Sequence, residues 1–189
     1  SDLLVGGAPV ATMGICHAYH FPLWLPAGAS LGVRARTAHI SDISIITNIW
    51  AFGGNRHPAS WWCGQKVETV GNMSPSTSRG QAHTPGASGT FSSWVDLGSP
   101  LGGRTGAIQY AAQAEGDTST SATAFHFEFG AGDAMIGPRM LHFLNGAEYP
   151  VQVSRMPIFC DLPEGAQLRV RGLASVAGAG IDVAAYAVQ

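Results

Sequence analysis

The sequence predicts an all-β protein, an antiparallel β-sandwich of jelly-roll-like form, from three observations. Apolar and polar residues alternate with period two in many short runs, as they do in half-buried strands. Glycine and proline interrupt the chain throughout, with 25 glycines and 11 prolines among 189 residues. Apolar residues do not recur at helical spacing over any long window. Short strands separated by Gly/Pro turns are typical of sandwiches and jelly rolls.

The alternation is clearest in three runs, Leu31–Thr37, Ala124–Phe129 and Ala166–Gly172. In the second run three phenylalanines share one face, and in the third Leu168 and Val170 point inward while their polar neighbours point outward. The further strands that we expect are Ala11–Tyr19, Ile43–Phe52, Gln65–Val70, Thr90–Val95, Ala107–Ala114, Arg139–Leu144, Val151–Phe159 and Gly180–Val188.

An internal repeat links the two ends of the chain. Residues 25–34 (LPAGASLGVR) and 162–171 (LPEGAQLRVR) are identical at seven of ten positions, and the match extends on both sides with small gaps. In each copy a strand ends at Leu-Pro, because proline removes a ladder donor, and the following glycine permits a tight turn. We therefore expect a duplicated structural corner, with Pro26 and Gly28 in one copy and Pro163 and Gly165 in the other. The leucine and valine of both following strands should be buried, namely Leu31, Val33, Leu168 and Val170.

Strand density divides the chain into three parts. Residues 88–189 hold enough strands for a complete sandwich, whereas residues 1–54 match only the second half of that unit. Residues 55–87 are loop-rich, with one plausible strand around Val67, and are predicted to be a linker or insertion. The first copy is therefore incomplete, and its unmatched ladder groups are costly. Strands from residues 55–89, a neighbouring subunit or a longer chain could supply the missing strands. We expect one of the last two, because residues 55–89 have little strand propensity.

Composition narrows the classes of partner. Charged residues are 12% of the chain, against about 25% in ordinary soluble domains. The net charge of −2 gives no basis for nucleic-acid binding, and the absence of an apolar run of about 18 residues predicts no membrane insertion. A weakly charged, Gly/Ala-rich surface favours association with other subunits. Cys16, Cys63 and Cys160 lack the spacing of a zinc site or disulfide framework, so we interpret them as small buried residues.

No catalytic, cofactor-binding or metal-binding motif is present. The chain lacks the nucleophile elbow, zinc-protease helix, phosphate-binding loop, dinucleotide fingerprint and calcium loop. His17 and His20 are three apart in an expected strand and so face opposite ways. His126 and Glu128 share a face, but two ligands are too few for a metal, and a polar outer face is the simpler interpretation. We expect no enzyme activity and no cofactor.

Three tryptophans are the candidate contact residues. Trp61 and Trp62 lie in the loop-rich segment, and Trp94 lies in an expected strand. Exposed tryptophans stack on sugar rings or anchor protein interfaces. Packing within the fold is the competing interpretation, and the sequence leaves both open.

The repeat resembles part of a known family. The pattern of strand, Leu-Pro-x-Gly corner, alternating strand, short turn and final strand in Leu25–Arg36 and Leu162–Gly172 resembles β-sandwich modules of tailed-phage and gene-transfer-agent virion proteins, of tail-fibre and head-spike type. Thr90–Leu97 resembles the opening strand of such a module. The resemblance implies a structural subunit of a virion, without enzymatic activity, in a homo-oligomer for which a trimer is favoured.

The function expected from this resemblance is therefore a tail fibre, head spike or decoration subunit that contacts other virion proteins and host-surface polysaccharide. A carbohydrate-binding module built on the tryptophans is the alternative. A polysaccharide-degrading enzyme is less favoured, because it needs two carboxylates facing each other across a cleft, and spacing alone does not reveal such a pair.

Overall fold

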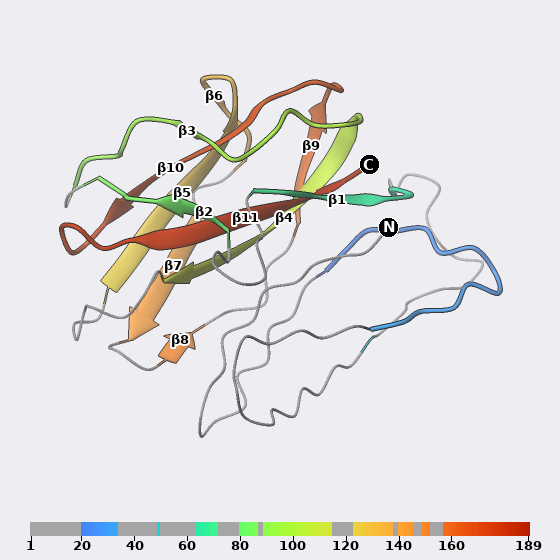
Figure 1. Ribbon diagram of the computed structural model, residues 1–189, viewed down its shortest axis with the longest axis horizontal. Helices are drawn as coiled ribbons and strands as arrows, with labels where there is room; N and C mark the ends of the chain where they lie inside the picture. Colours follow the sequence, from blue (N-terminus) through green and yellow to red (C-terminus); the bar gives the residue numbers. More distant parts are fainter. Residues whose placement is uncertain are drawn as a thin grey trace.

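The computed structural model describes residues 20–33, 49, 63–71, 80–86, 89–114, 123–137, 140–145, 149–151 and 157–189. Within these residues the protein is all-β and contains no helix, which confirms the all-β part of the predicted fold class (Figure 1). The described strands are β1 (Val67–Val70), β2 (Gln81–His83), β3 (Val95–Asp96), β4 (Thr105–Ala114), β5 (Thr123–Ala131), β6 (Ala134–Met135), β7 (Met140–Asn145), β8 (Tyr149–Val151), β9 (Ile158–Leu162), β10 (Leu168–Ala174) and β11 (Ile181–Val188).

The strands form two antiparallel sheets. The first sheet has the order β1-β11-β4-β9, and β2 also pairs with β11. The second sheet has the order β3-β10-β5-β7-β8, and β6 pairs with β5. The longest ladder joins β4 and β11, from Ile181 opposite Ala114 to Val188 opposite Ala107. The first sheet therefore pairs two segments that are distant in sequence, residues 181–188 and residues 107–114.

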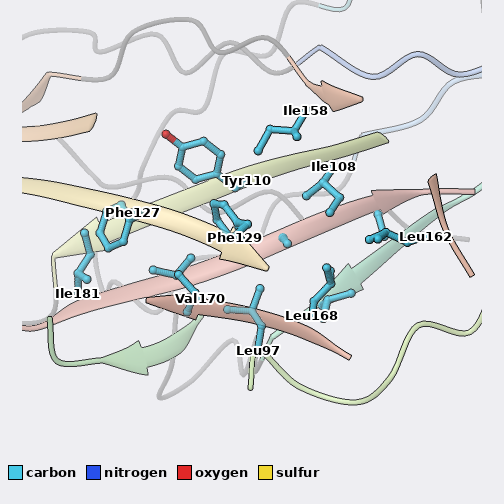
Figure 2. Close-up of a cluster of buried hydrophobic side chains, with 14 of the residues drawn as sticks. Leu97, Ile108, Tyr110, Phe127, Phe129, Ile158, Leu162, Leu168, Val170 and Ile181 are labelled. Carbon is cyan, nitrogen blue, oxygen red and sulfur yellow. The ribbon is translucent and has the colours of Figure 1, made fainter. Parts of the chain in front are cut away.

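One hydrophobic core draws side chains from both sheets (Figure 2). Phe125, Phe127 and Phe129 of β5 are buried as their alternation predicts, and so are Leu168 and Val170 of β10. The core residues of the first sheet include Ile108, Tyr110, Ile158, Leu162, Ile181 and Val183. The ring centroids of Tyr110 and Phe129 lie 5.2 Å apart, so these aromatic side chains join the two sheets directly. The two sheets therefore share one core, as in a β-sandwich.

Strand β11 is buried on both faces. Its residues Ile181, Val183, Ala185 and Ala187 belong to the core between the sheets, whereas Tyr186 and Val188 belong to a second cluster with Val67 and Ala107. Alternation places this second cluster on the outer face of the first sheet. Phe21 and Leu23 pack against it, and Phe21 makes an edge-on ring contact with Tyr186 at 5.8 Å. The segment 20–24 therefore covers part of the outer face.

Several strand predictions are confirmed and others need correction. β4, β5, β7, β10 and β11 lie where the alternation indicated. In contrast, the expected strand Thr90–Val95 is wrong for Thr90–Trp94, because β3 comprises only Val95–Asp96. The expected strand Val151–Phe159 contains the end of β8 and the start of β9. Ala11–Tyr19 and most of Ile43–Phe52 lie outside the described residues.

Residues 55–87 contribute more strand than the sequence indicated. Gln65–Val70 contains β1, as expected around Val67, but β2 was not foreseen, and both strands pair with β11. A three-residue strand is too short to show an alternating pattern, and its pairing is determined by the apolar strand beside it. The domain boundaries themselves stay a prediction.

Candidate functional site

The two Pro-Gly corners have the same local geometry. In each corner the amide N–H of an alanine donates a hydrogen bond to the carbonyl of the proline three residues earlier, at 3.1 Å for Pro26 and 3.2 Å for Pro163. The glycines have φ of 81° at Gly28 and 80° at Gly165, the value required at the third position of a type II turn. A Cβ at either glycine would meet no atom within 4 Å, so backbone conformation alone selects glycine.

The segments that follow the two corners differ. Leu168 and Val170 are fully buried in β10, whereas Leu31 and Val33 are 53% and 54% exposed and lie outside any strand. The expectation that all four side chains are buried is therefore wrong for the first copy. The cause is the environment, because β10 is paired on both sides by β3 and β5, and no such ladder holds residues 31–33.

The first copy is nevertheless attached to the first sheet. The amide of Trp24 donates to the carbonyl of Gly64 at 2.8 Å, and the amide of Gly64 donates to the carbonyl of Pro22 at 2.8 Å. Leu23 packs into the outer cluster while Trp24 remains 61% exposed. In the repeat, Leu23 and Trp24 correspond to Ile158 and Phe159 of β9. There the first side chain is buried and the second is 62% exposed.

A group of exposed apolar side chains follows this attachment point. Four large apolar side chains here are between 44% and 61% exposed. They are Trp24, Leu25, Leu31 and Val33, here called the apolar segment. Single exposed apolar residues are ordinary on protein surfaces, whereas contiguous exposed apolar patches are characteristic of contact surfaces. Trp24 was not among the candidate residues predicted from the sequence, although its position in the repeat corresponds to that of Phe159 on the edge strand β9.

The outer face of the second sheet carries a compact group of charged and aromatic side chains. Arg171 of β10 lies opposite Glu128 of β5, and its Nε and Nη2 donate to Glu128 Oε2 at 2.7 Å and 2.6 Å. The guanidinium carbon of Arg171 lies 4.5 Å from the ring centroid of Trp94 and 5.1 Å from that of Phe91. Glu128 is only 3% exposed, so this carboxylate depends on its hydrogen-bonding partners.

The neighbouring arginine makes weaker contacts. Arg169 donates from Nε to Asp96 at 2.7 Å and from Nη1 to Asp133 at 2.8 Å, and both carboxylates are largely exposed. The hydrogen bond to Asp96 raises the pKa of Arg169, which keeps it charged at any ordinary pH. Exposed ion pairs of this kind contribute little to stability.

Trp94 is half-buried and packed within this face. A Cβ at Gly130 would come within 2.9 Å of its Cη2 atom, so the indole crosses the sheet where only glycine leaves room. Together with the Arg171 contact, this packing accounts for the burial of Trp94. Trp61 and Trp62 lie outside the described residues, so of the three candidate tryptophans the structure places Trp94 alone.

The remaining candidate residues form no metal site in the described part of the chain. Glu128 is engaged with Arg171, while its neighbour His126 is half-buried, and His17 lies outside the described residues. No group of three or more His, Cys, Asp or Glu side chains there is placed to hold a metal ion. Burial raises the pKa of the Cys160 thiol to about 11, so this thiol is protonated at neutral pH and is a poor nucleophile or ligand.

Comparison with known proteins found no family model, no curated protein and no solved structure that matches this chain. The residues that the structure describes include no helix with the length and apolarity needed to span a membrane.

Proposed function

We propose that this chain is a structural subunit of a phage-type virion, a tail fibre, head spike or decoration protein, that assembles with copies of itself. The observation that carries the proposal is the exposed apolar segment, Trp24, Leu25, Leu31 and Val33, which follows the point where Phe21 and Leu23 pack on the outer face of the first sheet. Contact between subunits would bury these side chains, and each buried Å² of apolar surface contributes about 25 cal/mol.

The composition supports the same proposal. With 12% charged residues, the chain has few charges to keep its surfaces apart, so association is favoured. Closed symmetric assembly is the common way for copies of one chain to bury such surfaces. The trimer is proposed from the resemblance to fibre and spike modules, as are the location in the virion and the contact with other virion proteins.

The finer description of the fold belongs to this proposal as well. We propose that the two sheets form a jelly-roll-like sandwich and that residues 1–54 are an incomplete first copy of the unit that ends the chain. The matching turns at Gly28 and Gly165, and the matching exposure of Trp24 and Phe159, support a common origin of the two corners.

The carbohydrate-binding alternative has one observation in its favour, the exposure of Trp24, since a sugar ring stacks on an accessible indole. Trp94 supports it less well, because its ring lies against Arg171 and Gly130. A polysaccharide contact therefore remains a secondary activity in this proposal.

Sedimentation of the purified chain tests the proposed assembly. We expect a mass three times that of the 19.6 kDa chain at micromolar concentration, and we expect Leu31→Asp to give monomers, because the aspartate would be buried without a partner. Met135→Asp is the matched control, since Met135 is 52% exposed on β6, far along the chain from the apolar segment. A wild-type monomer, or equal dissociation of both variants, would contradict assembly through the apolar segment.

A further inference from the structure

A buried histidine lies where the chain crosses from the first sheet to the second. His83, the last residue of β2, pairs with Ile181 of β11 in the first sheet. Three residues later, the amide of Gly86 donates to the carbonyl of Gly172 in β10 at 2.9 Å, and the amide of Ala174 donates to the carbonyl of Gly86 at 3.1 Å. Residues 81–86 are therefore hydrogen-bonded to both sheets and connect them.

The next part of the chain folds back onto this crossing. The amide of Ser92 donates to the same Gly172 carbonyl at 2.8 Å. A Cβ at Gly86 would overlap the carbonyl oxygen of Thr90, so these two segments touch through their backbones. Residues 81–86 and 89–92 thus form one packed unit, here called the crossover.

The hydrogen bonding of His83 is incomplete. Its side chain is 3% exposed, and Nε2 lies 3.2 Å from the hydroxyl oxygen of Ser92, which also accepts a hydrogen bond from the amide of Gly172 at 3.1 Å. The other ring nitrogen, Nδ1, is buried and has no hydrogen-bond partner among the described residues. A neutral imidazole needs one donor contact and one acceptor contact, so one of the two is missing here.

Charged groups on the neighbouring elements do not compensate for this burial. Asp182 of β11 pairs with Ala82, one position from His83, and alternation directs its side chain to the opposite face of the sheet. Arg171 of β10 lies on the outer face of the second sheet and is paired with Glu128. Ser92, from the returning segment, is uncharged. Burial accordingly lowers the pKa of His83 below its ordinary value, and no charged group among the described residues adds to the shift.

We propose that His83 is an acid-sensitive latch: its neutral ring holds the crossover against both sheets, and protonation releases the crossover. The imidazolium would be a buried charge with an unpaired N–H at Nδ1, and it is hydrated only when the crossover opens. The inference does not depend on the proposed virion function, because it concerns this part of the fold alone.

The direction of the pH dependence follows from linkage. Since the pKa of His83 is lower in the closed state than in the open state, the open state binds the proton more tightly. The closed state is therefore fully favoured above a pH of about 6.5 and loses stability as the pH falls toward the pKa of the closed state. One proton changes the opening equilibrium by at most about tenfold per pH unit.

Hydrogen exchange on the full-length protein tests the latch. After correction for intrinsic rates, the opening constant at the amides of Gly86 and Ser92 should rise up to tenfold per unit below a pH of about 6.5, while the β4–β11 ladder shows no such change. A ring titration by NMR should place the pKa of His83 below 6.5. A His83 pKa at or above 6.5 in the folded protein would overturn the proposal, and this measurement requires no variant.

Two histidine variants make the assignment specific. In His83→Gln the pH-dependent part of crossover opening should vanish, because glutamine does not titrate. His126→Gln, which replaces a half-buried histidine on β5, should keep the wild-type dependence. If His83→Gln retains the full dependence, or if His126→Gln abolishes it, the latch does not reside in His83.

Discussion

Replacing Arg171 by methionine is expected to lower the free energy of unfolding by about 3 kcal/mol, the lower end of the range for breaking a buried ion pair. The lower end applies because the Arg171 side chain is 34% exposed, whereas its partner Glu128 is 3% exposed. The variant removes the hydrogen bonds that Arg171 donates to this buried carboxylate and also removes the cation from the rings of Trp94 and Phe91. Urea denaturation of both proteins at neutral pH measures the difference.

Arg169→Met is the matched control for this prediction. Arg169 lies two residues away on the same face of β10, but its partners Asp96 and Asp133 are 55% and 86% exposed. We expect its loss to cost clearly less than the loss of Arg171. Equal costs for the two arginines would show that the burial of Glu128 does not govern the stability of this face. The double variant Arg171→Met, Glu128→Leu should recover much of the loss, because the buried carboxylate is then removed together with Arg171.

Truncating Phe127 to alanine is expected to cost about 3–5 kcal/mol of unfolding free energy. The side chain is fully buried between the sheets, and its ring lies parallel to that of Phe125, with centroids 6.0 Å apart. Removing it leaves a cavity that the surrounding strands fill only in part. The loss is measured by denaturant unfolding at one fixed protein concentration.

Phe159→Ala provides the matched comparison, since Phe159 is 62% exposed on the edge strand β9. An exposed substitution of this kind changes the unfolding free energy by about 0.5 kcal/mol at most. Equal stability of the two phenylalanine variants would contradict the placement of Phe127 in a core shared by the two sheets.

Much of the core was predictable from the sequence because strand alternation is a local property. The phenylalanines of β5 and the Leu168–Val170 pair of β10 are buried as the period-two pattern indicated. The same pattern failed for Leu31 and Val33, whose sequence matches that of β10 closely. Burial depends on whether another strand lies alongside, and a single sequence does not carry that information for a repeated segment.

The contacts of the outer face were less predictable. Alternation places Arg171 and Glu128 on outward-facing positions, but their pairing depends on the register between β5 and β10, which are separated by several strands in sequence. Likewise, the crossing of Trp94 over Gly130 requires β3 to lie beside β10. The role of β2 was missed for the same reason, because a strand of three residues acquires its position from its neighbour.

The location of this chain in particles released by the cells that encode it provides a direct test of the proposed virion role. Particles are separated on a density gradient, and the chain is quantified by mass spectrometry in each fraction, before and after a high-salt wash. The account predicts that the chain co-sediments with intact particles, in a copy number divisible by three, and resists the wash because its contacts are apolar rather than ionic. Recovery of the chain solely in the particle-free fractions would contradict the account.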